Sequence, residues 1–316
     1  MDPDPRMRHY GAFYDLEPLP GAGSATAGAG AGREDATGPR VLVYGNCQAE
    51  ALRVSLASGG TVQSVRMPPV HELTPQDLPH LHRLLGWADV LVAQSVADGY
   101  RRLPLGTRQV ATRLRRDARV VLIPNYFSTV LYPEQVLVRH EDPRVSDPPL
   151  VPYHDVRRLG VAAGWNGPAE MPRTAVREGA EASIVELRRR ESEQGSLMIS
   201  DVVRHAGAGW TVDHPGNPVL LALAQRVIDE VGAGGAVRDP GRVLLPEVMT
   251  PLRPEVLGAL GLDPAAARTG WVVGGEQVRD EEVGAAHEKF YSAHPRVVEV
   301  GLEKKGAVLR HLGWRP

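Results

Sequence analysis

A short apolar strand that runs into a polar corner and then a helix constrains this chain most. Residues 41–44 (Val-Leu-Val-Tyr) have the pattern of a buried strand, and residues 49–56 follow with helical spacing. The corner at residues 45–48 is Gly-Asn-Cys-Gln, so Cys47, the one cysteine in 316 residues, stands where a helix begins. Backbone N–H groups that lack partners in the first turn favour a thiolate and can donate to an oxyanion.

A lone cysteine is more often a small hydrophobic core residue than a nucleophile. Here its position favours chemistry, because a strand carries Cys47 to the edge of a sheet and Gly45 and Asn46 lead into it. The corner residues Gly45, Asn46 and Gln48 are therefore predicted to contribute to a substrate or oxyanion site around the thiol.

Composition excludes several classes of protein. The formal net charge is −2 and the pI is about 6.6, which argues against a nucleic-acid partner bound by counterion release. One cysteine rules out a disulfide framework and any cysteine-rich zinc site, so we expect no metal. The polar N-terminus and the lack of a long apolar run predict a cytoplasmic protein that does not insert into membranes.

Residues 1–39 are expected to form a flexible arm and linker ahead of one α/β domain at residues 40–316. Residues 21–38 are rich in glycine and alanine and cannot bury a core, so we predict that they are mobile. Three aromatic side chains precede this tract within five residues: Tyr10, Phe13 and Tyr14. A simple tail does not need them, and we predict that they dock onto the main domain.

From residue 40 the pattern alternates between strands and helices. Strands are predicted at 40–44, 61–66, 88–93 and 119–123, with helices at 48–58, 74–85 and 106–116. This order predicts a parallel, doubly wound sheet flanked by helices, with ligands beyond the carboxyl ends of its strands. Those ends carry polar residues at three places: Asn46-Cys47, Gln94-Ser95 and Asn125-Tyr126.

Helices dominate after residue 140. They are predicted at 153–163, 172–192, 196–206 and 217–231, with several shorter ones to the end of the chain. We interpret residues 150–210 as a helical insertion that forms part of a substrate pocket. Residues 240–316 are predicted to form a mostly helical layer, with a short strand at 270–273.

His214 is the best-placed base among the eleven histidines. It lies on a loop immediately before the predicted helix 217–231, and Pro215 holds it in extended geometry. A histidine that serves only the capping loop is the alternative, and both remain open. His154 is a second candidate, which could contact substrate.

These residues together resemble the WcbI family of polysaccharide-biosynthesis acetyltransferases. The resemblance covers roughly residues 40–235 and depends on Gly-Asn-Cys-Gln after the first strand, Gln94, residues 124–127 (Pro-Asn-Tyr-Phe) and His214-Pro215. It implies acetyl transfer from coenzyme A thioesters to capsule sugars.

The order of the motifs also resembles SGNH hydrolases, which implies a role for each residue. Cys47 would replace the serine nucleophile, Asn125 would be the oxyanion asparagine, and His214 would be the base. In the mechanism that we expect, the Cys47 N–H and Gln94 join Asn125 around the oxyanion. The hydrolase carboxylate, three residues before the histidine, is Thr211 here. A full triad is therefore not expected, but a Cys–His pair can work without a third member.

The sequence thus predicts an acyltransferase that uses acetyl-CoA and a saccharide-type hydroxyl acceptor, with catalytic Cys47 and His214. Tyr126 and His154 are added to the predicted substrate contacts. Two alternatives remain open: a cysteine esterase or thioesterase, in which water takes the acyl group, and a non-catalytic module that binds CoA or a saccharide. Nothing in the sequence indicates an oligomeric state.

Overall fold

The structure is a computed structural model, and it describes residues 4–21, 38–138 and 147–316. The predicted mobile tract at residues 21–38 lies, apart from its two end residues, outside this part of the chain. Contacts divide the chain into two compact units. Unit 1 holds Met1–Asn125, Arg189–Ile199 and Leu220–Val243, and unit 2 holds Tyr126–Arg188, Ser200–Val219 and Leu244–Pro316.

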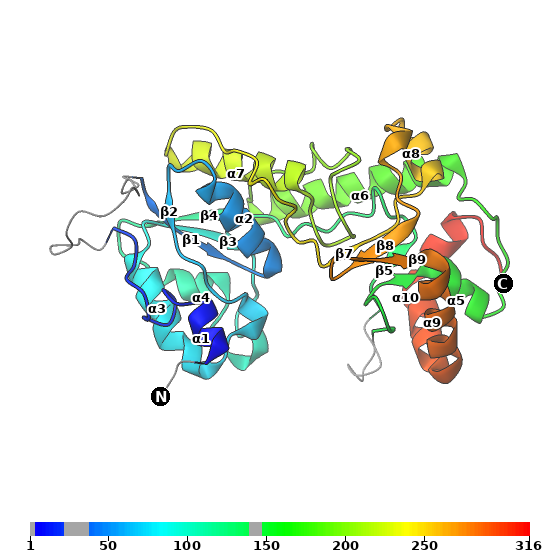
Figure 1. Ribbon diagram of the computed structural model, residues 1–316, viewed down its shortest axis with the longest axis horizontal. Coiled ribbons are helices and arrows are strands. Elements are labelled where there is room, and N and C mark those ends of the chain that lie inside the picture. The colour runs from blue at the N-terminus through cyan, green and yellow to red at the C-terminus, as the bar shows by residue number, and fades with distance from the viewer. Residues whose placement is uncertain (1–3, 22–37, 139–146) are drawn as a thin grey trace. The chain divides into compact units, whose positions relative to one another are not determined.

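Unit 1 is built on a four-stranded parallel sheet in the order β2-β1-β3-β4 (Figure 1). Its elements are α1 (Pro5–His9), β1 (Arg40–Tyr44), α2 (Cys47–Ala57), β2 (Gln63–Ser64), α3 (Leu78–Trp87), β3 (Val90–Gln94), α4 (Thr107–Ala111) and β4 (Arg119–Ile123). Helices α2 and α7 (Asn217–Val231) lie on one face of the sheet, and α3 and α4 lie on the other. The predicted α/β fold is confirmed.

The strand order has one consequence for function. The chain leaves β1 towards β2 on one side and later leaves β3 towards β4 on the other, so the direction of winding reverses between β1 and β3. Open α/β sheets bind ligands outside the carboxyl ends of the strands at this switch point.

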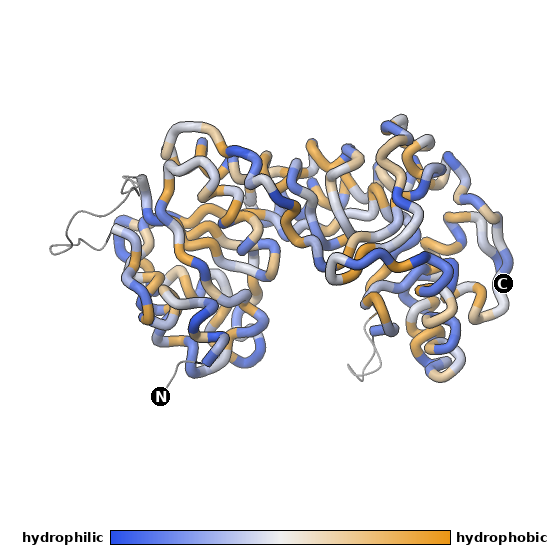
Figure 2. Tube along the Cα trace, viewed as in Figure 1, coloured by the Kyte–Doolittle hydropathy of each residue, from blue (hydrophilic) through white to orange (hydrophobic). Residues whose placement is uncertain are grey.

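The central strands are apolar on both sides because helices cover both faces. Every residue of β3 is buried, as are the last four of β1, and the middle of the sheet is mostly orange in Figure 2. One core cluster packs Leu42 and Tyr44 of β1 against α3, with Leu81, Leu84 and Leu85 fully buried.

The aromatic residues before the Gly/Ala tract belong to that same core. Phe13 is 0% exposed and Tyr14 is 8% exposed, and Tyr10 packs at the margin of the cluster. The Tyr14 hydroxyl donates to Asp77 Oδ1 at 2.7 Å, and Trp87 Nε1 donates to the Pro20 carbonyl at 3.1 Å. The predicted docking of this arm is confirmed.

Unit 2 has a helical framework with two small antiparallel sheets. Its elements are β5 (Gln135–Val136), β6 (His154–Asp155), α5 (Val156–Ala162), β7 (Val248–Met249), α8 (Pro254–Leu260), β8 (Gly270–Val273), β9 (Glu276–Arg279), α9 (Asp280–Ala293) and α10 (Pro295–His311). Helix α6 (Arg173–Gln194), like α7, contributes residues to both units. The core joins α5, α9 and α10 around Val156, Leu159 and Leu309.

Two local predictions are corrected. Residues 196–206 were predicted as a helix, but the segment is irregular. Its backbone donors bond elsewhere: the Leu197 N–H donates to the Leu122 carbonyl, and the Ile199 N–H donates to Glu191 Oε1. The strand at 270–273 is confirmed as β8, but it belongs to a hairpin with β9 that the sequence analysis missed.

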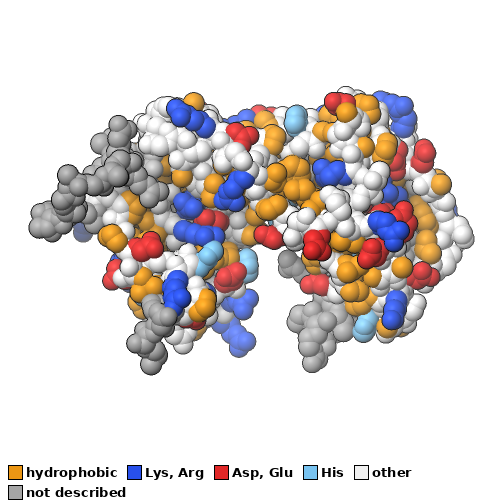
Figure 3. Space-filling view, in the orientation of Figure 1, with side chains coloured by type: hydrophobic (Ala, Val, Ile, Leu, Met, Phe, Trp, Pro, Cys, Tyr) orange, Lys and Arg blue, Asp and Glu red, His pale blue; other side chains and the backbone are white. Residues whose placement is uncertain are grey.

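Charge is evenly distributed over the face shown in Figure 3, where basic and acidic side chains are interspersed. Among residues 4–21, 38–138 and 147–316, no helix is both long and apolar enough to cross a bilayer.

Candidate active site

The corner after β1 presents Cys47 as the first residue of α2. Asn46 caps the helix, because its Oδ1 accepts a hydrogen bond from the Gln48 N–H at 3.0 Å and its carbonyl accepts from the Ala49 N–H. Cys47 is half-buried. The partial positive charge of the helix N-terminus favours an anionic group at this position.

A buried glutamine at the end of β3 fixes this corner. Gln94 Oε1 accepts from the Asn46 N–H at 2.8 Å, and Gln94 Nε2 donates to Gln48 Oε1 at 3.0 Å. The side chain of Gln94 is 2% exposed. Gly45 allows the contact, since a Cβ there would stand 2.2 Å from Gln94 Oε1. Gln94 therefore positions the residues on either side of Cys47.

Thr107, at the first position of α4, supports Gln94 in turn. Its hydroxyl donates to the Gln94 carbonyl at 2.6 Å and accepts from the Val96 N–H at 2.9 Å. The sequence analysis did not single out this residue. A small polar residue that begins a helix soon after a strand was the available signal.

Asn125 follows β4 on the same edge of the sheet. The register pairs Tyr44 with Ala93 and Gln94 with Ile123, so the corner, Gln94 and Asn125 follow three neighbouring strands. Asn125 is half-buried, and its carbonyl accepts a long hydrogen bond of 3.4 Å from Arg190 Nη1. Within unit 1 the structure thus brings Gly45, Asn46, Cys47, Gln48, Gln94 and Asn125 to one edge, at the switch point between β1 and β3.

His214 belongs to unit 2, on the loop that leads into α7. Thr211, which stands where the hydrolase carboxylate would be, organises this loop: its Oγ1 accepts from the His214 N–H at 3.0 Å and donates to Asp213 Oδ1 at 2.8 Å. The Tyr153 hydroxyl also donates to Asp213 Oδ1, at 2.7 Å. The neighbouring carboxylate is thereby held by two hydroxyl groups.

The environment of His214 favours the neutral ring. Burial lowers the pKa of His214 below its ordinary value, and the negative charges of Asp213 and Glu247 oppose this effect without reversing it. A neutral imidazole at pH 7 can accept a proton, which is what a general base requires.

The other two predicted residues are buried in unit 2. Tyr126 is 3% exposed, its hydroxyl lies against Gly209, and burial raises its pKa. His154 is 1% exposed, lies in strand β6, and shares a hydrogen bond of 2.9 Å between its Nδ1 and the Tyr291 hydroxyl. Their contacts with substrate stay predictions, and the burial of both rings does not favour them.

The model of the family described as "Polysaccharide biosynthesis enzyme WcbI" matches residues 40–236, more than half of the chain.

The chain belongs to the WcbI family.

A solved structure of a WcbI protein has the same fold. It is described as a polysaccharide biosynthesis enzyme, in native form without a disulfide bond between CoA and one of its cysteines. It aligns with a TM-score of 0.64 and 17% identity, and the match covers 84% of this chain and 99% of that one. At that identity the likeness establishes the fold alone. No curated protein matches the chain.

The WcbI family match contains every candidate residue described above, from Gly45 to His214, but begins after the aromatic arm. In the described part of the chain, no group of three or more His, Cys, Asp or Glu side chains is arranged to hold a metal ion.

Proposed function

We propose that this WcbI-family protein is an acyl-CoA-dependent O-acyltransferase that acetylates a saccharide hydroxyl through Cys47 and His214. The observation that carries the proposal is the position of Cys47 as the first residue of α2, at the switch point of the sheet. Around it, Asn46, Gln94 and Asn125 supply polar groups from three neighbouring strands.

In the first step, the Cys47 thiolate attacks the carbonyl carbon of the acyl-CoA thioester. The negative charge that develops on the carbonyl oxygen is stabilised by the Cys47 N–H and the Asn125 side-chain amide. The carbon–sulfur bond to CoA breaks, CoA leaves as a thiolate, and the acyl group remains on Cys47. One thioester replaces another, so the step is close to balanced in free energy.

In the second step, a hydroxyl of the acceptor attacks the acylated Cys47 while His214 takes its proton. The lowered pKa of His214 supports this role, because the ring is neutral and able to accept a proton at pH 7. The Cys47 thiolate then departs and the ester product is released.

Two facts support CoA and a sugar as the substrates. The family is described as a polysaccharide biosynthesis enzyme. The description of the solved WcbI structure names CoA and a cysteine, in a form without a disulfide bond between them. A cysteine nucleophile also suits a thioester donor. A cysteine thiol is already partly ionised near neutral pH, so it depends less on a general base than a serine hydroxyl does.

The test follows CoA release from acetyl-CoA by chromatography, with and without a panel of oligosaccharide acceptors. Release that requires an acceptor, with an acetylated product, supports the transferase. Release without acceptor indicates the thioesterase alternative, and binding without release indicates a non-catalytic module. Cys47→Ala is the matched control, which should abolish release in the first two cases.

A further inference from the structure

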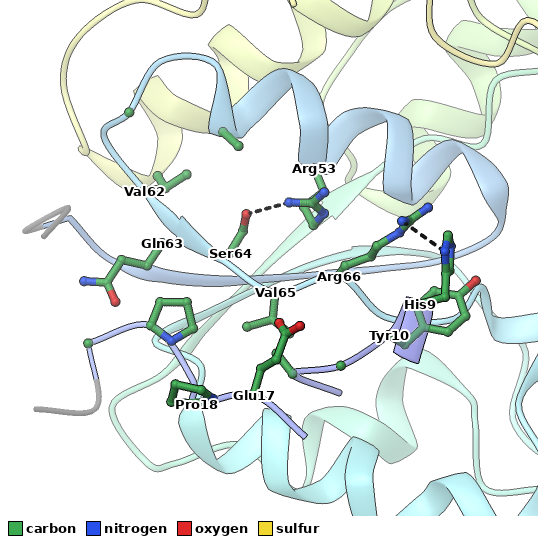
Figure 4. Close-up of a pocket in the computed structure, with 16 residues that line it drawn as sticks. His9, Tyr10, Glu17, Pro18, Arg53, Val62, Gln63, Ser64, Val65 and Arg66 are labelled. Carbon is green, nitrogen blue, oxygen red and sulfur yellow. Dashed lines mark hydrogen bonds between the residues drawn. The ribbon is translucent and has the colours of Figure 1, made fainter. Parts of the chain in front are cut away.

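A second feature of unit 1 lies beside the edge strand, where the arm and β2 enclose a hollow of about 650 Å³ (Figure 4). The arm forms one wall with residues 9–12, 17, 18, 20 and 21, and residues 62–66 form the other. Arg53 of α2 lies across from the arm residues Glu17 and Pro18 in this view.

The arm is anchored to the rest of unit 1 beside the residues that line the hollow. Phe13 and Tyr14 are anchored in the core, and Trp87 Nε1 holds the Pro20 carbonyl beyond them. Among the described residues β2 pairs with β1 alone, so the arm runs beside the edge without adding a strand to the sheet. The outer edge of a strand keeps peptide groups that can bond to a ligand.

The hollow is bordered by equal numbers of arginine and acidic side chains. Arg53 holds the Glu50 carboxylate through Nε and Nη2 at 2.7 and 2.8 Å, and Arg66 Nε contacts the same carboxylate at 3.2 Å. Glu17 adds a second carboxylate from the arm. Two guanidinium groups thus face two carboxylates, which does not favour a phosphate dianion.

Polar groups of both kinds line the rest of the hollow, next to an aromatic ring. The Arg66 guanidinium lies 5.6 Å from the centre of the Tyr10 ring, and the His9 and Tyr10 rings form a T-shaped pair with 4.6 Å between their centres. Gln63 and Ser64 offer donors and acceptors from the opposite wall. A neutral ligand with many hydroxyl groups and an apolar face matches this lining.

We propose that this hollow binds a neutral saccharide and is a subsite for the acceptor of the reaction proposed above, on which the inference rests. The hollow extends past the carboxyl end of β2 to Arg66. The segment that follows is joined to the corner by a hydrogen bond of 2.8 Å from the Val70 N–H to the Gly45 carbonyl. The arm wall of the hollow lies before the WcbI match, while the opposite wall at residues 62–66 lies within it.

Gly11 sets the position of the Glu17 carboxylate. A Cβ at Gly11 would stand 2.6 Å from Glu17 Cδ and Oε1. Because that carboxylate is the free end of an exposed side chain, Gly11→Ala should move it aside without disturbing the fold. The variant changes the hollow while it keeps every charge.

The experiment screens the full-length protein on an array of neutral bacterial capsular and O-antigen oligosaccharides, then measures the strongest binder by calorimetry. Tyr10→Ala, Glu17→Gln and Gly11→Ala should each weaken binding about threefold to tenfold. Asp15→Asn is the matched control, since this exposed acid on the same arm pairs with Arg83 and does not line the hollow. Circular dichroism verifies that each variant is folded.

Three results would overturn the proposal. The first is that no oligosaccharide binds, and the second is that the three variants leave binding unchanged. The third is that adenosine 3′,5′-bisphosphate competes with the oligosaccharide, which would make the hollow a nucleotide site. Acetylation of Cys47 by acetyl-CoA without acceptor is measured in parallel. If acetylation persists while oligosaccharide binding fails, the subsite is wrong and the acyl transfer stands. If acetylation fails while binding persists, the hollow binds a saccharide, but the acyl transfer and the role of the hollow as its acceptor subsite are both wrong.

Discussion

Gln94 Oε1 accepts a hydrogen bond of 2.8 Å from the backbone N–H of Asn46, the residue before the candidate nucleophile. The same amide donates to Gln48, the residue after it. One buried side chain from β3 therefore holds both neighbours of Cys47, and the conformation of the corner is set across two strands of the sheet.

Gly45→Ala tests this arrangement. The new Cβ would meet Gln94 Oε1 at 2.2 Å, so the buried amide must move and its hydrogen bonds must break. We expect a loss of about 1–3 kcal/mol in the free energy of unfolding, together with slower reaction of Cys47 with iodoacetamide. Chemical denaturation and mass spectrometry measure the two effects.

Gly86→Ala is the matched control, because a Cβ there meets nothing within 4 Å and alanine favours the helix α3. It should leave both readouts unchanged or raise stability slightly. If Gly45→Ala behaves like this control, Gln94 does not position the corner.

The sheet could be predicted from sequence because its strands are continuous apolar runs with helices between them. Residues 40–44 and 119–123 match β1 and β4 without error. The helix predicted at residues 196–206 was wrong because backbone N–H groups of this segment bond outside it. Leu197 donates to the carbonyl of Leu122 in β4, which is far away in sequence, and Ile199 donates to the Glu191 side chain near the end of α6. The hairpin of β8 and β9 did have a signal, the Gly274-Gly275 turn with positive φ at both residues.

For the candidate site, the sequence predicts where the residues lie but not how they bond to one another. Strand ends at Cys47, Gln94 and Asn125 follow from the alternating pattern and meet at one edge. Their bonding does not follow from it. Nothing local in the sequence indicates that Gln94 bonds to Asn46 and Gln48, and the position of Thr107 at the start of a helix does not indicate that its hydroxyl bonds to Gln94.

Tyr14→Phe tests the anchoring of the arm. The Tyr14 hydroxyl donates to Asp77, which is 2% exposed, so its removal leaves a buried carboxylate with one donor fewer. We expect a loss of about 1–2 kcal/mol in the free energy of unfolding. Tyr100→Phe is the control, since Tyr100 is half-buried at the margin of the same core cluster but lies outside the arm. Equal losses in the two variants would contradict the anchoring role.

Asp89 predicts a loss of stability in acid. The hydrogen bond from the Arg40 guanidinium, with further contributions from the Arg40 N–H and Arg115, lowers the pKa of Asp89 to about 2. A carboxylate whose pKa is lower in the folded state stabilises the protein above the unfolded value of about 3.9, and this contribution disappears as the pH falls towards 2. Asp89→Asn should therefore lose less stability between pH 5 and pH 2.5 in urea denaturation. Parallel pH curves for the two proteins would rule out this role.

His214 predicts the pH dependence of turnover. Burial lowers its pKa, and the base acts in its neutral form, so the acid limb of the profile of kcat/KM against pH should lie below about 6.5 and activity should be flat at pH 7. His214→Ala should lower turnover about 100-fold to 10,000-fold and remove the limb. His154→Ala, at a ring 1% exposed, should instead act mainly through stability. If His154→Ala lost more turnover than His214→Ala, His154 and not His214 would be the base.

The most direct test of the account is the intact mass of the protein after incubation with acetyl-CoA and no acceptor. Because the chain has one cysteine, the account predicts a single acetyl group that hydroxylamine removes, that maps to Cys47, and that Cys47→Ala lacks. Cys47→Ser should keep the fold and lose most turnover. An unlabelled protein that still turns over fully, or a Cys47→Ser variant with normal turnover and reduced stability, would contradict the nucleophilic role of Cys47.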